Sequence, residues 1–265
     1  MDYFGILFLL IGIGAISVSI DRIPHWPLYG WLSVGFAGVI ALLAFGWLEL
    51  KIKSPLVNLR LLSNRQFVGF AVGGMAGNIA WSIIVFGSTL LLQQVLHFSA
   101  LDAGLFFLFI SCSTAIASFL GARLERQFGA TLLVAVALVL QAIGLIIMFI
   151  DDNPIWLAIA MVVAGFGCAW SWSMSQAGAI ITMPKEKVGM ASGSIMTVVI
   201  LAGNTAIVIV ATIIDVYQRE HGGNYAVGIE VSYLIGACAA VVGLVGLLLI
   251  LGHSMKAGKA IEKTS

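Results

Sequence analysis

The chain has 265 residues and a formal net charge of +1; 61% of its residues are hydrophobic and only 9% are Asp, Glu, Lys or Arg. Soluble domains carry about 25% charged residues, so this composition excludes an ordinary water-soluble domain. The sequence has no basic stripe for phosphates, which excludes nucleic acid as a partner. Cys112, Cys168 and Cys238 lie in apolar runs at spacings that fit neither a zinc site nor a disulfide framework, and we interpret them as small packing residues.

Eight runs of about twenty uncharged residues follow one another along the chain. They cover residues 3–20, 28–48, 66–94, 103–122, 130–150, 155–182, 188–214 and 231–252. The charged residues and all five prolines lie between these runs or at their margins. A charge at the centre of a bilayer costs about 2.5–3.5 kcal/mol, so this distribution is typical of a membrane protein. The sequence therefore predicts an all-α protein with eight transmembrane helices. The first run follows Asp2 rather than a basic segment, so we interpret it as a retained helix and not a secretory signal.

Basic residues gather in every second connector. All 13 Lys and Arg residues apart from Arg22 and Arg219 fall after the second, fourth or sixth run or in the C-terminal tail. The positive-inside rule places such segments in the cytoplasm. We therefore expect a multi-pass protein of the cell (inner) membrane with both termini cytoplasmic.

Connector lengths indicate how the chain is organised. The longest cytoplasmic connector separates two leading helices from six helices that are joined by short loops. We predict two linker transmembrane helices at 1–50, a cytoplasmic connector at 51–65, a six-helix bundle at 66–252 and a cytoplasmic tail at 253–265.

Glycines and other small residues are spaced four apart in several runs, as in "GGMAG" (73–77), "GFGCA" (165–169) and "GMASG" (189–193). Helices in lipid associate where small residues let their backbones approach closely. The predicted helix-packing positions are Gly73, Gly77, Gly165, Gly189, Gly193 and Gly203. We expect the first turn of the run at 188–214 to contact another helix, either in a sliding contact or in static packing.

Four segments resemble parts of one membrane-protein family. "KVGMASGSIMTVVILAGNTAIVIVATII" (187–214) resembles the eleventh core helix of the major facilitator superfamily, in the fourteen-helix branch that contains the drug:proton antiporters. "SPLVNLRLLSNRQFVGF" (54–70) and "HFSALDAGLFF" (97–107) resemble the entries to its seventh and eighth core helices. "MDYFGILFLLIGIGAIS" (1–17) resembles the first of two helices that this branch inserts between its halves. The resemblance implies a C-terminal half: two linker helices and a six-helix bundle of major-facilitator type.

The resemblance also has implications for partners. Carriers of this superfamily rock two bundles around a site at the midplane of the membrane. Besides the lipid bilayer, we therefore expect a missing N-terminal six-helix half, or a second copy of this chain, as the partner. The family's proton-coupling and antiport motifs belong to the N-terminal half, and no acid or base lies deep in the eight runs.

A degenerate family motif lies between the fourth and fifth runs. The family often has Gly-x-Leu-x-Asp-Arg-x-Gly at its cytoplasmic gate, and this chain has "GARLERQFG" at 121–129. The resemblance makes Arg123, Glu125 and Arg126 candidates for a gate. The alternative is that they are ordinary cytoplasmic charges.

In this superfamily the first two helices of each three-helix repeat line the substrate cavity. On the corresponding runs, the neutral polar and aromatic candidates are Asn78, Trp81, Ser82, Trp170, Trp172, Ser173, Gln176 and Asn204. An apolar cavity with aromatic walls and a few amides suits a small lipophilic substrate, including a cation. Alternatively, these side chains form hydrogen bonds between helices or face the membrane interface.

Two functions remain open at this point. The sequence has no nucleophile elbow, P-loop or HExxH motif, so it predicts no enzyme, catalytic residue, metal or cofactor. The first function is transport, as the C-terminal half of a multidrug or small-molecule efflux carrier whose proton coupling would need residues outside this chain. The second is an inactive fragment or structural membrane remnant of such a carrier.

Overall fold

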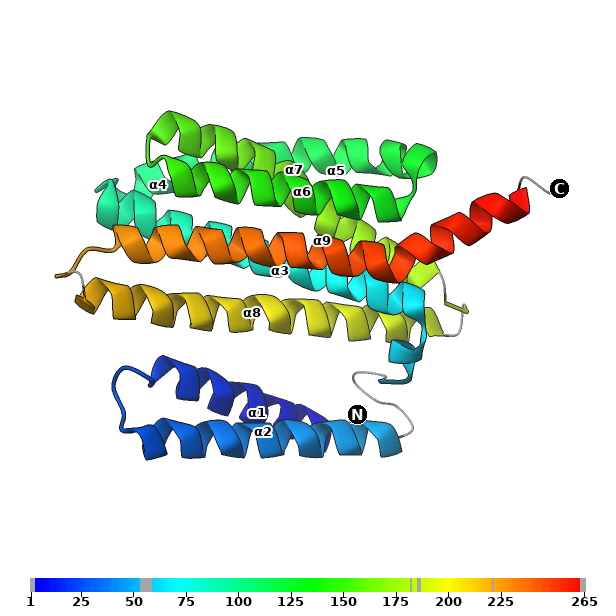
Figure 1. Cartoon of the computed structure of the whole chain (residues 1–265), viewed down its shortest axis with the longest axis horizontal. Helices are drawn as coiled ribbons and strands as arrows, with labels where there is room; N and C mark the ends of the chain where they lie inside the picture. The colour runs from blue at the N-terminus through cyan, green and yellow to red at the C-terminus, as the bar shows by residue number, and fades with distance from the viewer. Residues whose placement is uncertain (1–2, 53–58, 182, 185–186, 221, 263–265) are drawn as a thin grey trace.

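The computed structural model describes residues 3–52, 59–181, 183–184, 187–220 and 222–262, and all regular elements among them are helical (Figure 1). The elements are α1 (Tyr3–Asp21), α2 (Leu28–Lys51), η1 (Leu59–Ser63), α3 (Arg65–Leu90), the π-helical η2 (Leu91–Val95), α4 (Ala100–Phe106), α5 (Leu108–Phe128), α6 (Ala130–Ile150), α7 (Pro154–Ile181), α8 (Val188–Glu220) and α9 (Ala226–Glu262). The predicted all-α class is confirmed. Much of the connector predicted at 51–65, residues 53–58, lies outside the described residues.

Helix length and composition agree with membrane crossing. Among the described residues, seven segments are long and apolar enough to span a bilayer: Leu28–Lys51, Arg65–Val95, Ala100–Phe128, Ala130–Ile150, Pro154–Ile181, Val188–Glu220 and Ala226–Gly252. The remaining apolar helix, α1, has 19 residues. At 1.5 Å per residue it is about 28 Å long, close to the ~30 Å of a hydrocarbon core. The chain is therefore a multi-pass membrane protein.

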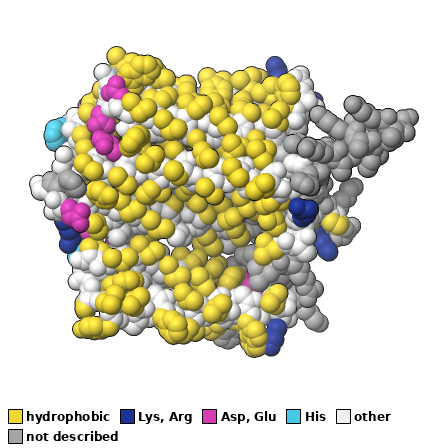
Figure 2. All heavy atoms as spheres, viewed as in Figure 1, with side chains coloured by type: hydrophobic (Ala, Val, Ile, Leu, Met, Phe, Trp, Pro, Cys, Tyr) yellow, Lys and Arg dark blue, Asp and Glu magenta, His cyan; other side chains and the backbone are white. Residues whose placement is uncertain are grey.

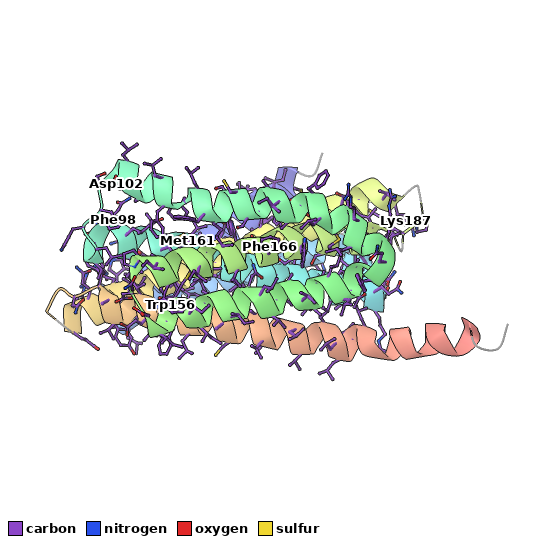
Figure 3. All side chains as sticks on the ribbon, turned by 90° about the horizontal axis from the view of Figure 1, so that it is seen from above. Phe98, Asp102, Trp156, Met161, Phe166 and Lys187 are labelled. Carbon is purple, nitrogen blue, oxygen red and sulfur yellow. The ribbon has the colours of Figure 1, made fainter. Side chains whose placement is uncertain are left out.

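The alternating direction of the helices sorts the charges. Connectors that follow α1, η2, α6 and α8 lie at one end of the molecule, and those that follow α2, α5 and α7 lie at the other (Figure 1). We call the first the acidic end, because acidic side chains gather there, and the second the basic end (Figure 2). Asp102 and Lys187 mark these two ends (Figure 3).

Helix boundaries differ from several of the predicted runs. The run at 103–122 is divided between α4 and α5 at Phe107. Helix α4 begins earlier than predicted because Ser99 caps it: its Oγ accepts a hydrogen bond from the amide of Asp102 at 3.1 Å. The run at 66–94 ends in the π-helical turn η2. Helix α9 extends beyond the run at 231–252 in both directions and is helical through most of the predicted tail.

Six helices form a bundle with α3 and α7 at its centre. Helix α5 packs on α7, and α8 packs on α3. Helix α6 packs on α7 and α9, and α9 also packs on α3. Buried apolar side chains such as Ile84, Leu138 and Met161 fill the space between these helices. Helices α1 and α2 pack on each other beside this bundle, and α1 contacts α8 (Figure 1).

Four of the predicted packing glycines lie against neighbouring helices. A Cβ at Gly73 would lie 2.7 Å from Cγ1 of Val134, and a Cβ at Gly77 would lie 2.6 Å from Cβ of Ser171. Real Cβ atoms do not approach other atoms this closely, so any larger residue there would push the helices apart. Gly165 and Gly203 are equally crowded by the helices opposite them.

Gly189 and Gly193 behave differently from this expectation. A Cβ at either position would meet no described atom within 4 Å. Both glycines lie on the exposed face of α8, whereas Ala191 and Ile195 occupy its buried face. This turn therefore packs on its neighbours through Ala191, and the two glycines themselves form no close contact among the residues that the structure describes.

Candidate substrate cavity

A cavity of about 640 Å³ opens between helices α3, α5, α7 and α8. Its lining residues are Gly74, Gly77, Asn78, Trp81, Ser82, Val85, Phe86, Thr89, Leu90, Thr114, Ser118, Cys168, Ala169, Ser171, Trp172, Ser173, Ile200, Asn204 and Ile207. None of these described lining residues is an acid, a histidine, a lysine or an arginine. The cavity is thus apolar and aromatic with uncharged polar groups, and its four helices are those that the resemblance implied.

Most of the predicted cavity residues come together here. Those that line the cavity are Asn78, Trp81, Ser82, Trp172, Ser173 and Asn204. They belong to α3, α7 and α8, so residues more than one hundred positions apart in the chain line the same cavity. That these residues contact a substrate remains a prediction.

Asn78 lies in the cavity lining and also joins two helices. Its Nδ2 donates a hydrogen bond to the backbone oxygen of Val199 on α8 at 2.8 Å. The missing side chain of Gly203 makes room for this bond, since a Cβ there would collide with the Asn78 amide. The bond fixes the distance between α3 and α8 at the cavity.

Two of the predicted residues do not line the cavity. Trp170 is only 9% exposed, and its indole Nε1 donates a hydrogen bond to the backbone oxygen of Ala117 at 2.8 Å. Its ring also meets Phe166 edge to face, with 6.0 Å between centroids. Trp170 therefore joins α7 to α5 behind the cavity. Gln176, on the next turn of α7 after Ser173, is half-buried outside the lining.

Gln141 was not among the predicted residues, and it contacts Gly77 and Cys168 of the cavity lining. This α6 side chain is fully buried. Its Nε2 donates to the backbone oxygen of Gly77 at 3.0 Å and contacts Sγ of Cys168 at 3.2 Å. Its Oε1 has no hydrogen-bond partner among the described atoms. A single amide in the otherwise apolar run 130–150 was the available signal, but the resemblance assigned that run to a helix away from the cavity.

The candidate gate residues lie in the last turns of α5. The guanidinium of Arg123 lies 5.0 Å from the centre of the Phe119 ring. Within the described part of the chain, no ion pair joins Arg123, Glu125 or Arg126 to another side chain. Their role as a gate remains a prediction.

Comparison with known proteins assigns the family. A family model described as Major Facilitator Superfamily matches residues 1–204. The chain belongs to the major facilitator superfamily. This confirms, at the level of the superfamily, the resemblance drawn from the helix motifs.

Relatives of this superfamily member share moderate identity with it. An uncharacterized MFS-type transporter of Bacillus subtilis, YwoD, is 29% identical over 197 residues, which cover 73% of this chain and 41% of YwoD. The multidrug resistance protein Stp of Mycobacterium tuberculosis is 26% identical over 208 residues, covering 72% of this chain and 36% of Stp. Multidrug resistance protein 3 of B. subtilis is 23% identical over 193 residues, covering 68% of this chain and 36% of that protein. The matched region thus spans about two fifths of the length of these relatives.

Proposed function

We propose that this chain supplies the C-terminal half bundle, with two linker helices, of a carrier that exports small lipophilic molecules. Membership of a transporter superfamily favours transport over catalysis. Two of the relatives are named multidrug resistance proteins, which supports efflux as the direction. The observation that carries the proposal is the cavity between α3, α5, α7 and α8, because it combines a ligand-sized volume with an uncharged, aromatic lining.

The size and chemistry of the cavity support a small apolar substrate. Ligand sites in proteins commonly have volumes of about 300–1,000 Å³ and a mostly hydrophobic lining with a few polar groups. Trp81, Phe86 and Trp172 supply aromatic surface here, and Asn204 supplies an amide. An anionic substrate would lose its hydration without gaining a positive charge among the described lining residues.

The exposed face of α8 supports completion by a second bundle. Gly189, Gly193, Met196, Ile200 and Asn204 are exposed along one side of this helix, and the last two also line the cavity. Small residues on an exposed helix face allow another helix to approach closely. We therefore propose that the partner, an N-terminal six-helix half or a second copy of this chain, packs against this face and closes the cavity.

Orientation and coupling form part of the same proposal. The basic end lies in the cytoplasm of a cell (inner) membrane protein by the positive-inside rule, which makes both termini cytoplasmic. Because no described residue of the cavity lining is an acid or a base, proton coupling would depend on ionisable groups of the partner bundle.

Dye binding and efflux together test this function. The purified chain in lipid nanodiscs should bind a lipophilic aromatic dye, and Trp172→Ala should weaken binding by removing cavity surface. The control, Trp156→Ala, changes a tryptophan on α7 that lies outside the cavity lining. Cells that co-express this chain with the N-terminal six helices of a relative such as YwoD should retain less dye than cells with either part alone. Absence of both dye binding and efflux would instead indicate an inactive remnant.

A further inference from the structure

One wall of the cavity carries hydroxyl groups from two adjacent helices. We call Thr114 and Ser118 of α5, together with Ser171 and Ser173 of α7, the hydroxyl wall. Each hydroxyl donates its proton to a backbone oxygen of its own helix: Thr114 to Ile110 at 2.7 Å, Ser118 to Thr114 at 2.8 Å, Ser171 to Cys168 at 3.2 Å and Ser173 to Ala169 at 2.8 Å.

This bonding pattern decides what the hydroxyl wall can offer to a ligand. A hydroxyl has one proton and two acceptor lone pairs, so a hydroxyl that has donated its proton can still accept. Releasing the proton for a ligand would break the bond to the backbone oxygen, and this loss would offset the gain from the new bond. The hydroxyl wall therefore presents hydrogen-bond acceptors to the cavity.

Two amides in or next to the cavity lining, Asn78 and Gln141, also present acceptors. Asn78 uses its Nδ2 to bond the backbone of α8, which leaves its amide oxygen as an acceptor. Next to the lining, the Nε2 of Gln141 donates a hydrogen bond to the backbone oxygen of Gly77. Its Oε1 has no hydrogen-bond partner in the described part of the chain. Donors without a hydrogen bond to another described residue remain at Trp81, Trp172, Ser82 and Asn204, and all but Trp172 belong to α3 and α8 rather than to the hydroxyl wall.

We propose that the hydroxyl wall binds an N–H donor, so that the cavity prefers protonated alkylamines with an aromatic skeleton over quaternary ammonium ions and carboxylates of the same skeleton. A protonated amine places positive N–H groups against acceptor oxygens, which makes charge-assisted hydrogen bonds. A quaternary ammonium ion has the same charge but no proton to donate. A carboxylate brings further acceptors to a wall of acceptors. This inference rests on the proposed function, since it requires that small aromatic molecules enter the cavity.

Three biphenyl ligands with one skeleton test the preference. The full chain in nanodiscs is titrated calorimetrically at pH 7 with 4-phenylbenzylammonium, its N,N,N-trimethyl derivative and 4-phenylbenzoate. The amine should bind at least about tenfold more tightly than the trimethyl derivative, because a hydrogen bond to a charged group contributes that much or more. The carboxylate should bind most weakly. Equal affinity for the amine and the trimethyl derivative would overturn the inference while leaving the proposed function intact, whereas no binding of any ligand would overturn both.

Variants of the hydroxyl wall locate the effect. Thr114→Val and Ser173→Ala each remove an acceptor and should reduce the tenfold preference to about twofold, with little change in trimethyl binding. Ser111→Ala is the matched control, because Ser111 also bonds its own helix, to the oxygen of Phe107 at 2.9 Å, but lies outside the cavity lining. An equal loss of preference in the control would contradict the assignment. Thr114 also bonds the oxygen of Gly165 at 3.2 Å, so Ser173→Ala decides the matter if Thr114→Val does not fold.

Discussion

Gly203 of α8 lies directly against the side-chain amide of Asn78 of α3, in the space that lets Asn78 bond the oxygen of Val199 at 2.8 Å. A Cβ at position 203 would collide with this amide and would lie 2.7 Å from Oγ of Ser82. The absence of a side chain at Gly203 thus permits a hydrogen bond between two helices inside a membrane, where polar groups have few other hydrogen-bond partners.

Substitution at this glycine should therefore loosen the α3–α8 contact. We expect Gly203→Ala to lower the free energy of unfolding by about 1–3 kcal/mol, the usual cost of overpacking, as measured by thermal unfolding in detergent. Gly193→Ala, on the same helix, places its methyl group in open space and should leave stability unchanged or raise it by the higher helix propensity of alanine. If both variants lose the same stability, the contact with Asn78 is not the cause.

The exposed face of α8 gives a second prediction, about assembly. Gly193→Leu should leave the stability of the chain alone unchanged, because no described atom lies within 4 Å of the new Cβ. The same variant should weaken association with the partner bundle, because close helix approach requires small residues. The measurement is recovery of a tagged N-terminal half, or of a second tagged copy, with the variant. Unchanged recovery of both would exclude this face as the contact.

Trp170 and Trp172 should separate stability from binding although they are two positions apart. Trp170→Phe removes the indole donor to the oxygen of Ala117 and replaces a buried ring by a smaller one, and it should cost about 1–3 kcal/mol. Trp172→Phe keeps an aromatic ring in the cavity lining and should alter dye affinity with little effect on unfolding. The free energy of unfolding and the dye affinity are measured on each variant. A loss of dye affinity in Trp170→Phe together with a loss of stability in Trp172→Phe would contradict these roles.

The arrangement of the helices could be predicted because lipid imposes strict rules on the chain. A charge cannot remain at the bilayer centre, so the positions of residues such as Lys51, Asp102 and Lys187 reveal where helices end. Successive connectors should therefore lie at opposite ends of the molecule. In the structure they alternate in this way between the acidic and the basic end. The break at Phe107 was not predicted, because an apolar run has the same appearance whether its helix is continuous or interrupted.

The direction of individual side chains could be predicted only in part. Asn78, Trp81 and Ser82 share a face by helical spacing, and all three line the cavity. Trp170 and Trp172 have the same composition around them, yet only the second faces the cavity. The rotation of a helix about its own axis is set by the helices that pack against it. When all faces of a helix are apolar, its sequence has no difference between polar and apolar faces that would show which face is buried. Gln141 was missed for the related reason that a polar bond between helices depends on tertiary structure.

Gln141 yields a prediction in which the order of three substitutions matters. Gln141→Leu loses one hydrogen bond between helices, worth about 0.6 kcal/mol on average, but also removes the unpaired Oε1. We therefore expect a change within about 1 kcal/mol. Gln141→Ala leaves a void among α3, α6 and α7 and should cost at least about 2 kcal/mol. Gln141→Glu should be the most harmful at pH 8, because a carboxylate would face the backbone oxygen of Gly77. A leucine variant less stable than the alanine variant would contradict this account.

A carboxylate in the connector between α6 and α7 gives the last prediction, which concerns pH. Partial burial, and then the negative charge of Asp151, raise the pKa of Asp152. A raised pKa means that the folded chain holds this proton more tightly than the unfolded chain. Asp152 therefore costs no stability below the ordinary Asp pKa, and the cost appears as pH rises through the raised pKa.

Asp152→Asn removes this cost and should make the chain more stable than the parent at pH 7. The gain should be below about 1 kcal/mol, because the carboxylate is largely solvated. Near pH 3 the two proteins should unfold at the same temperature, since the parent carboxyl is then protonated. The measurement is the unfolding temperature of both proteins across this pH range in one detergent. A gain that persists undiminished at pH 3 would have a cause other than the charge, because the substitution would then act equally on the neutral acid.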